Sequence, residues 1–302
     1  MALPFKLVYH DGYDLNLGAH VFPSQKFRLI KERLVAEGFA EDSDFVAPER
    51  ATDHDLTLVH SEDWVTRLRS GRLRFEEVLQ LEIPYSQEMV NAFWLAAGGS
   101  ILAARGALRD RLGYNIGGGF HHAFRGHGEG FCAIHDVAVA IRRLQADKLI
   151  GRAMVIDCDV HHGNGTAGIF AGDATVFTLS IHQYNNYPSV KPPSNLDIHL
   201  EDGVEDEEYL QRLQDGLTYA MNSFRPDLVA YVAGSDPYYD DQLGGLALTL
   251  EGLKQRDSLV LSAALQHQTP AFVTLAGGYA RKLDDTVTIH SNTAKVAAAL
   301  LT

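Results

Sequence analysis

The sequence predicts a three-layer α/β fold, with a mostly parallel central sheet and helices on both of its faces. Short apolar runs alternate with longer amphipathic segments along the chain, and the runs are apolar at successive positions rather than at every second one. Strands of that kind are buried on both faces, which requires a helical layer on each side of the sheet. The 302 residues show no internal repeat and no linker-like segment, so residues 1–302 are expected to form a single domain.

The N-terminal third contains few strong signals. An apolar run at residues 5–9 predicts a first strand, and the amphipathic pattern of residues 24–37 predicts a helix. The polar stretch 41–60 is expected to be irregular, and its histidines, His54 and His60, to be surface or structural residues. Apolar residues at helical spacing predict two further helices, over 61–69 and 86–109.

The rest of the chain alternates predicted strands with predicted helices. Four apolar runs predict buried strands, at 153–156, 175–181, 228–233 and 271–275. Amphipathic segments predict helices at 136–146, 206–224, 249–266 and 284–301. A long polar loop is expected over 183–203, and loops of that length usually have a functional reason. Two acids in another loop, Asp240 and Asp241, are expected to be solvated.

Polar side chains follow three of the predicted strands at the points where the strands end. Asp157, Asp159 and His161 alternate along one strand exit, so their side chains project to the same side. Asp236 follows a second strand and Tyr279 a third, and ligands bind beyond such strand ends in parallel sheets. Two carboxylates and an imidazole are costly to bury together without a cation. We therefore predict a divalent metal site; the alternative is that the acids only cap a turn.

A glycine-rich loop, residues 117–119, precedes the adjacent histidines His121 and His122. Such a loop can approach a ligand closely, and paired histidines are candidates for proton transfer; alternatively, they are only hydrogen-bonded loop residues. Asp159, His161 and Asp236 would give a metal three protein ligands and leave room for water and a substrate carbonyl. One histidine would move the water's proton to the leaving amine, and Tyr279 would stabilise the oxyanion. The set predicts metal-assisted amide hydrolysis.

The composition of the chain restricts which binding partners and which cellular location are expected. The formal net charge of −13 disfavours DNA and RNA as partners and is compatible with a cationic substrate. The two cysteines, Cys132 and Cys158, cannot form a disulfide framework, which favours a reducing compartment. The N-terminus lacks the long apolar segment of a signal peptide, and no run reaches membrane-spanning length. A cytoplasmic protein that does not interact with membranes is expected, and its oligomeric state is not indicated.

Five motifs resemble the zinc-dependent histone deacetylase family of the arginase/deacetylase superfamily, in both order and separation. They are residues 117–122, 157–165, 234–236, 241–246 and 277–279. Three other stretches look closest to the class IV branch, at 180–188, 206–210 and 248–253. The resemblance implies an arginase-like α/β fold with Zn²⁺, or alternatively Fe²⁺, on Asp159, His161 and Asp236.

The resemblance also implies roles for other residues. In the family, the residues matching Asp157 and Asn164 orient His121 and His122 respectively, and the residue matching Tyr279 polarises the carbonyl. A potassium ion (K⁺) is implied near the site, on the positions Asp157, Asp159, His161, Ser180 and Ile181. The substrate channel is implied to have Gly130 and Phe131 on one side and Tyr184 or Tyr187 on the other.

One departure from the family pattern concerns proton transfer. Asn164 stands where many class I members have an aspartate, so His122 lacks a negative partner and is expected to be less readily protonated. Which histidine delivers the final proton is left open.

Three functions fit the sequence. The first is a zinc-dependent deacylase acting on Nε-acyl-lysine in a peptide or protein, with the acyl length open. The second is an amidohydrolase acting on acetylpolyamines or other acylated small amines, which uses nearly the same motifs. The third is a metal-stabilised binding protein without catalysis, which the intact histidine pair and Tyr279 disfavour.

Overall fold

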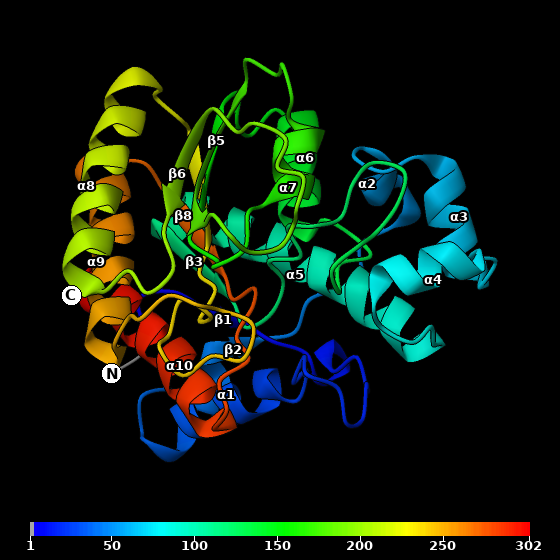
Figure 1. The fold of residues 1–302 in the computed structure, drawn as a ribbon, viewed down its shortest axis with the longest axis horizontal. Helices are drawn as coiled ribbons and strands as arrows, with labels where there is room; N and C mark the ends of the chain where they lie inside the picture. Colours follow the sequence, from blue (N-terminus) through cyan, green and yellow to red (C-terminus); the bar gives the residue numbers. More distant parts are fainter. Residues whose placement is uncertain (1–2) are drawn as a thin grey trace.

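The computed structural model describes residues 3–302, which form one eight-stranded sheet flanked by helices (Figure 1). Every strand pair is parallel, and the strand order is β2-β1-β3-β8-β7-β4-β5-β6. The strands are β1 (Leu7–Val8), β2 (Phe45–Val46), β3 (Leu112–Asn115), β4 (Ala153–Asp157), β5 (Val176–Gln183), β6 (Leu196–Leu200), β7 (Leu228–Val232) and β8 (Ala271–Thr274). The predicted parallel sheet is confirmed.

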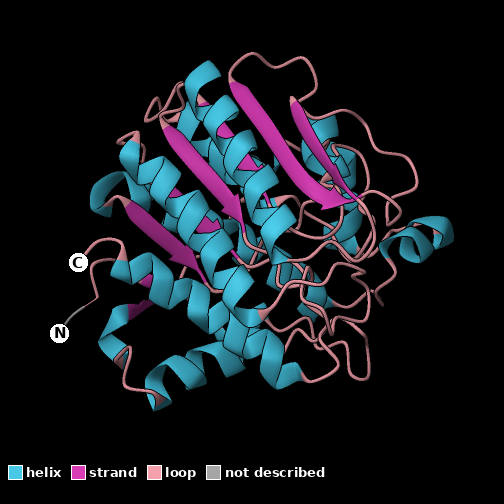
Figure 2. Cartoon of the chain, turned by 60° about the vertical axis from the view of Figure 1, so that its left-hand side comes forward, coloured by secondary structure: helices cyan, strands magenta, loops and turns pink. Residues whose placement is uncertain are grey.

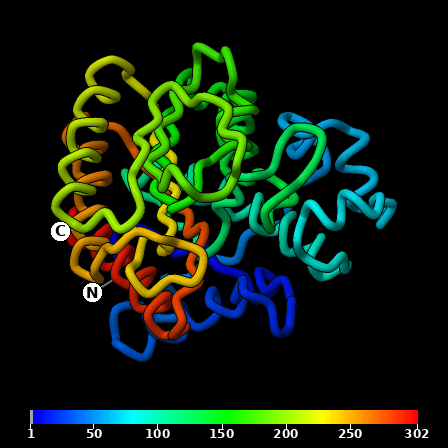
Figure 3. Tube along the Cα trace, viewed as in Figure 1, coloured from blue at the N-terminus to red at the C-terminus, as the bar shows by residue number. Residues whose placement is uncertain are grey.

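Helices cover both faces of the sheet, as predicted. The α-helices are α1 (Lys26–Ala36), α2 (Asp53–Thr57), α3 (Glu62–Ser70), α4 (Phe75–Leu81), α5 (Gln87–Asp110), α6 (Asp136–Ala146), α7 (Asn164–Ile169), α8 (Asp206–Ser223), α9 (Leu250–Gln266) and α10 (Leu283–Ala299). Helices α8 and α9 lie on one side of the strands and α5 and α6 on the other, and Figure 2 shows helices crossing in front of the sheet. Helices α2, α3 and α4 extend away from the sheet, to the right in Figure 3.

Two stretches expected to be irregular contain regular structure. Within residues 41–60 the chain forms a 3-10 turn (Asp42–Asp44), β2 and α2, and β2 pairs with β1 at the edge of the sheet. Within 183–203 it forms β6, whose residues Leu196, Ile198 and Leu200 alternate with polar ones. In both cases pairing with a neighbouring strand stabilises a short segment whose own signal is weak.

Helix α5 packs closely against other segments through its small residues. Ser86 begins the helix by accepting a hydrogen bond from the backbone N–H of Met89 at 2.9 Å. A Cβ added at Gly98 would lie 1.9 Å from the carbonyl oxygen of Glu49, so only glycine permits this approach. Among residues 3–302, no helix combines the length and apolar character needed to cross a membrane.

The strand order determines where the candidate site residues meet. Strands β8, β7, β4 and β5 are direct neighbours, so their carboxyl ends lie together at one edge of the sheet. Asp159 and His161 follow β4, Asp236 follows β7 and Tyr279 follows β8. These strands are fully buried, which holds their exits in fixed relative positions.

His60, expected to be a surface or structural residue, is structural and only 1% exposed. Its Nδ1 lies 2.9 Å from the carbonyl oxygen of Phe124, and its Nε2 accepts a hydrogen bond from the backbone N–H of His135 at 3.0 Å. These contacts specify a neutral ring, with the proton on Nδ1, that supports the loop carrying the histidine pair. Burial lowers the pKa of His60 to about 4, against the backbone hydrogen bonds, which raise it.

We expect His60 to make the fold acid-labile. The unfolded chain protonates this histidine below a pH of about 6.5 and the folded chain does not, so folding stability falls as the pH falls from about 6.5 to about 4. When the pH falls from 7 to 5, the free energy of unfolding should fall by about 2 kcal/mol more in the wild-type protein than in His60→Ala. Urea unfolding at the two pH values measures this, with the exposed His54→Ala as control. Equal losses in all three proteins would contradict it.

Candidate active site

Three buried side chains with metal-ligating atoms meet beyond β4 and β7. One ligand atom from each of Asp159, His161 and Asp236 lies within 4.8 Å of the other two. Nδ1 of His161 is 2.9 Å from Oδ1 of Asp159 and 3.3 Å from Oδ2 of Asp236. Two ligands of a tetrahedral zinc ion lie about 3.3 Å apart, given bond lengths of about 2.0–2.1 Å. The three side chains predicted as metal ligands are therefore brought together with spacings that suit one small ion.

The carboxylates of Asp159 and Asp236 accept several hydrogen bonds within the described part of the chain, but one of their oxygens accepts none there and could bind an ion. Oδ1 of Asp236 accepts from the N–H of Val160 at 2.9 Å, and Oδ2 of Asp159 accepts from the N–H of Gly277 at 2.8 Å. Oδ2 of Asp236 is buried, with no hydrogen-bond donor among the described residues. A Cβ at Gly277 would lie 2.1 Å from this oxygen, so glycine keeps the space open. Burial and the Asp159 carboxylate raise the pKa of Asp236 to about 7, as expected where two buried acids face each other.

The two adjacent histidines differ in their partners. Nδ1 of His121 is 2.7 Å from Oδ2 of Asp157, and Nδ1 of His122 is 2.7 Å from Oδ1 of Asn164. An oxygen partner at Nδ1 places that proton on Nδ1, which leaves Nε2 of a neutral His122 with a free lone pair. Each pairing is the one implied by the resemblance. Both histidines are buried, and their ring centres are 4.0 Å apart.

The different partners separate the pKa values of the two rings. Burial favours the neutral form of His121, but the carboxylates of Asp157 and Asp159 outweigh it and raise the pKa to about 9. Burial lowers the pKa of His122 well below its usual value, and the neighbouring His121 and His161 lower it further. His122 is thus the neutral member of the pair, because of burial and the two neighbouring rings; the hydrogen bond with Asn164 acts in the opposite direction and raises the pKa.

Glu129 is a site residue that the sequence analysis missed. Its Oε1 accepts hydrogen bonds from Nδ2 of Asn164 at 2.6 Å and from the hydroxyl of Tyr187 at 2.9 Å. Burial opposes the charged form, but hydrogen bonds from His127, Asn164, Tyr187 and Gln80 lower the pKa of Glu129, so it is ionised. A negative charge therefore lies directly behind the Asn164 amide. The signal in the sequence is an acid immediately before Gly130.

A narrow pocket of about 170 Å³ leads to these groups. Its lining includes His122, Gly130, Phe131, His161, Asn186, Tyr187, Leu243, Tyr279 and Glu82. The rings of Phe131 and Tyr279 are 6.0 Å apart. Tyr184, the other candidate for the channel wall, is 52% exposed and lines a different hollow with His199. Of the two tyrosines, only Tyr187 lines this pocket.

Asp241 was expected to be solvated, and this was wrong: it is 7% exposed. Its carboxylate accepts hydrogen bonds from three backbone N–H groups, those of Tyr279 at 2.7 Å, Leu243 at 2.8 Å and Gly244 at 2.9 Å. These bonds replace the water that an exposed acid would bind. Asp241 thereby fixes the backbone at Tyr279, whose side chain faces the pocket.

The positions implied for potassium lie on two neighbouring strands: Asp157, Asp159 and His161 at and just beyond the end of β4, and Ser180 and Ile181 in β5. Asp157 ends β4 and is the register partner of Ser180 in β5, and Ile181 follows Ser180. Asp157 is also the hydrogen-bond partner of His121, so this position lies directly behind the histidine pair.

Comparison with known proteins assigns the chain to a family. A sequence model of the histone deacetylase domain matches residues 20–294. The chain belongs to the histone deacetylase family. Histone deacetylase 2 of Arabidopsis thaliana is 33% identical to this family member over 286 residues, covering 90% of this chain and 74% of the relative. The acetoin utilization protein AcuC of Bacillus subtilis is 30% identical, covering 90% and 76%.

An uncharacterised protein of Picosynechococcus sp. is 41% identical to this histone deacetylase family member over 288 residues, covering 95% of this chain and 96% of the relative. The crystal structure of the HDA15 HD domain shares the fold, with a TM-score of 0.83 at 23% identity over 97% of this chain and 88% of that one. The arginase/deacetylase-like α/β fold is thus confirmed. The chain is a deacetylase-type hydrolase, and its buried acid and histidine cluster could hold the metal on which this family generally depends.

Proposed function

We propose that this histone deacetylase family member is a zinc-dependent hydrolase that removes acyl groups from Nε-acyl-lysine, in the class IV branch of the family. The observation that carries the proposal is the small pocket whose lining includes His122, His161 and Tyr279. Its volume of about 170 Å³ is below the roughly 300–1,000 Å³ of drug-sized ligand sites. A slender acylated lysine suits such a pocket, and a short acyl group suits it better than a long one.

The side chains of the pocket have separate roles in the proposed reaction. A zinc ion held by Asp159, His161 and Asp236 would polarise the substrate carbonyl and acidify water; ferrous iron suits the same donors. Nε2 of His122 accepts the proton of the attacking water and returns a proton to the leaving amine. The hydroxyl of Tyr279 donates to the carbonyl oxygen as negative charge develops on it.

Other residues orient these groups. Asn164, held by Glu129, fixes the ring of His122, and Asp157 fixes His121. The aromatic rings of Phe131 and Tyr187 enclose the lysine chain and exclude water from it. A potassium ion near Asp157, Ser180 and Ile181, reached mostly through backbone oxygens, belongs to the same proposal.

One observation, the negative charge at the pocket, favours a second class of substrate, the acylated polyamines. Glu82 contributes to the pocket lining, and the whole chain carries a formal net charge of −13. Both features attract cations, which include acylated polyamines as well as lysine-rich peptides. The two substrate classes are separated by direct assay.

The purified protein is expected to release acetate from an Nε-acetyl-lysine peptide, to lose this activity on chelation and to regain it with Zn²⁺. A series of longer acyl groups on the same peptide and a set of acetylpolyamines are assayed in parallel. Asp236→Asn, which removes a metal-binding charge with little change in shape, should be inactive under all conditions. Turnover of acetylpolyamines alone, or activity that survives complete metal removal, would contradict the proposal.

A further inference from the structure

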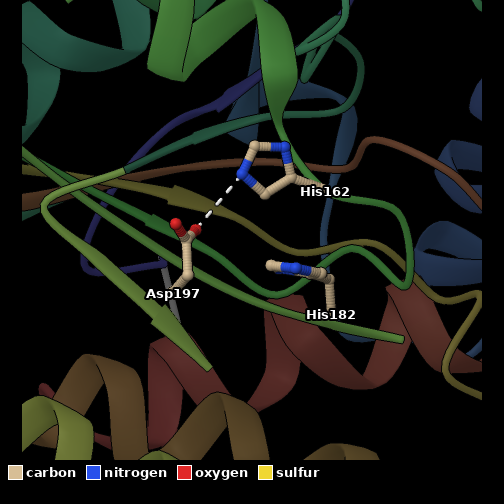
Figure 4. A group of neighbouring side chains, drawn as sticks. All are labelled: His162, His182 and Asp197. Carbon is tan, nitrogen blue, oxygen red and sulfur yellow. Dashed lines mark hydrogen bonds and ion pairs between the residues drawn. The ribbon is translucent and has the colours of Figure 1, made fainter. Parts of the chain in front are cut away.

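A second group of metal-ligating side chains lies outside the proposed active site. His162 follows β4, His182 lies near the end of β5 and Asp197 lies in β6. Figure 4 shows the two imidazoles and the carboxylate gathered around one small space. One ligand atom from each residue lies within 4.8 Å of the other two. Both histidines are 0% exposed, and the Asp197 side chain is 16% exposed.

We propose that His162, His182 and Asp197 form a second binding site for a first-row divalent metal ion such as Zn²⁺. Nε2 of His162 is 3.2 Å from Oδ1 of Asp197, close to the separation of about 3.3 Å between two ligands of tetrahedral zinc. Two imidazole nitrogens and one carboxylate oxygen suit Zn²⁺, Co²⁺ or Ni²⁺. Mg²⁺ and Ca²⁺ prefer shells made entirely of oxygen, so they do not fit this group.

Neighbouring residues orient the proposed ligands. Nδ1 of His182 is 2.9 Å from the hydroxyl oxygen of Ser180, which can accept its proton and leave Nε2 free for an ion. Oδ2 of Asp197 accepts a hydrogen bond from the backbone N–H of Ser194 at 2.9 Å, which directs Oδ1 toward His162. Nδ1 of His199 lies 2.9 Å from Nε2 of His182 and borders the site, but His199 is outside the group of three and is not counted as a ligand.

The site is open to solvent on one side. Asp197 and His199 line a surface hollow of about 980 Å³ together with Tyr184, through which an ion can enter. The ligands come from the exits of β4 and β5 and from edge strand β6, so a bound ion would fasten β6 to the interior of the sheet. The segment between β5 and β6 carries Tyr187, a wall of the catalytic pocket. The ion would therefore be structural, and it shares no ligand with the catalytic site.

The test counts metal ions without reading activity, so it is independent of the proposed deacylase function. Zinc bound per chain is measured by equilibrium dialysis and elemental analysis. The wild-type protein should bind two Zn²⁺ ions and Asp236→Ala, which lacks a catalytic-site ligand, should bind one. Adding Asp197→Asn to Asp236→Ala, a substitution that keeps the side-chain shape, should weaken the remaining site at least about 10- to 100-fold. Zn²⁺ should raise the Tm of Asp236→Ala but not that of the double variant.

Two further variants make the result decisive. His182→Ala in the Asp236→Ala background should also weaken binding of the remaining ion. His267→Ala, at an exposed histidine that ends α9, should leave it unchanged in the same background. Absence of Zn²⁺ from Asp236→Ala at a free concentration that fills the wild-type protein would overturn the proposal, and the group would be a hydrogen-bonded cluster only. Equal binding by Asp236→Ala and Asp236→Ala/Asp197→Asn would overturn it as well.

Discussion

Tyr279→Phe is expected to lower kcat about 100- to 1,000-fold, the usual cost of losing one oxyanion donor, with little change in KM or bound metal. The ring of Tyr279 is held by aromatic neighbours, with centroids 6.1 Å from Phe22 and 6.0 Å from Phe131, so phenylalanine should occupy the same position. Its backbone N–H donates to Asp241, a contact that the substitution keeps. Only the hydroxyl is removed. Steady-state kinetics on an Nε-acetyl-lysine peptide, with metal analysis of both proteins, measures the effect.

The matched control is Tyr184→Phe. Tyr184 is exposed and lies outside the pocket that Tyr279 lines, so removal of its hydroxyl should leave kcat within about twofold. Unchanged activity of Tyr279→Phe would rule out the oxyanion role, whether or not zinc is bound. A rise in KM with constant kcat would mean that the hydroxyl binds the ground state and the transition state equally.

The central strands and β1 could be predicted from the sequence, and the edge strands β2 and β6 could not. Strands β4, β5, β7 and β8 are fully buried, and continuous apolar runs mark them. The apolar run at residues 5–9 predicts β1 (Leu7–Val8), whereas β2 has only two residues, too few for periodicity to show. Strand β3 contains Gly113 at a point where a Cβ would lie 1.9 Å from the backbone oxygen of Ala103, so packing rather than strand propensity selects its residue.

The site residues also fall into those that the sequence predicts and those that it does not. Asp159, Asp236 and Tyr279 follow apolar strands, and the parallel order brings such positions together whatever the loops do. Glu129 and Asp241 act through hydrogen bonds to distant parts of the chain, 35 residues away at Asn164 and 38 at Tyr279. Glu129 stands before Gly130 and Asp241 begins one of the five motifs, but neither pattern shows which donors the acids bind. Their roles depend on tertiary contacts that local patterns do not encode.

His122→Ala is expected to lower kcat about 100- to 10,000-fold, the range for the loss of a general acid or base. His122 is the member of the pair whose burial and cationic neighbours keep it neutral, and a neutral imidazole can take a proton from water. His121 has a charged hydrogen-bond partner, Asp157. In the proposed mechanism it serves mainly to hold positive charge near the carbonyl. His121→Ala should therefore cost less than His122→Ala. The opposite order would assign the base to His121.

Asn164→Asp tests the same assignment through the pH profile. A carboxylate in place of the amide stabilises protonated His122 and raises its pKa, so the base form is lost at a higher pH. The acid limb of kcat/KM should move to higher pH relative to the wild-type protein, while bound zinc stays the same. Glu129 would lie within reach of the new carboxylate, since its Oε1 accepts from Asn164 at 2.6 Å, and its negative charge also favours protonated His122. Combining Asn164→Asp with Glu129→Gln should reverse part of the shift. If the acid limb stays in place while His122→Ala is inactive, the titrating group is His121 and the roles of the two histidines are exchanged.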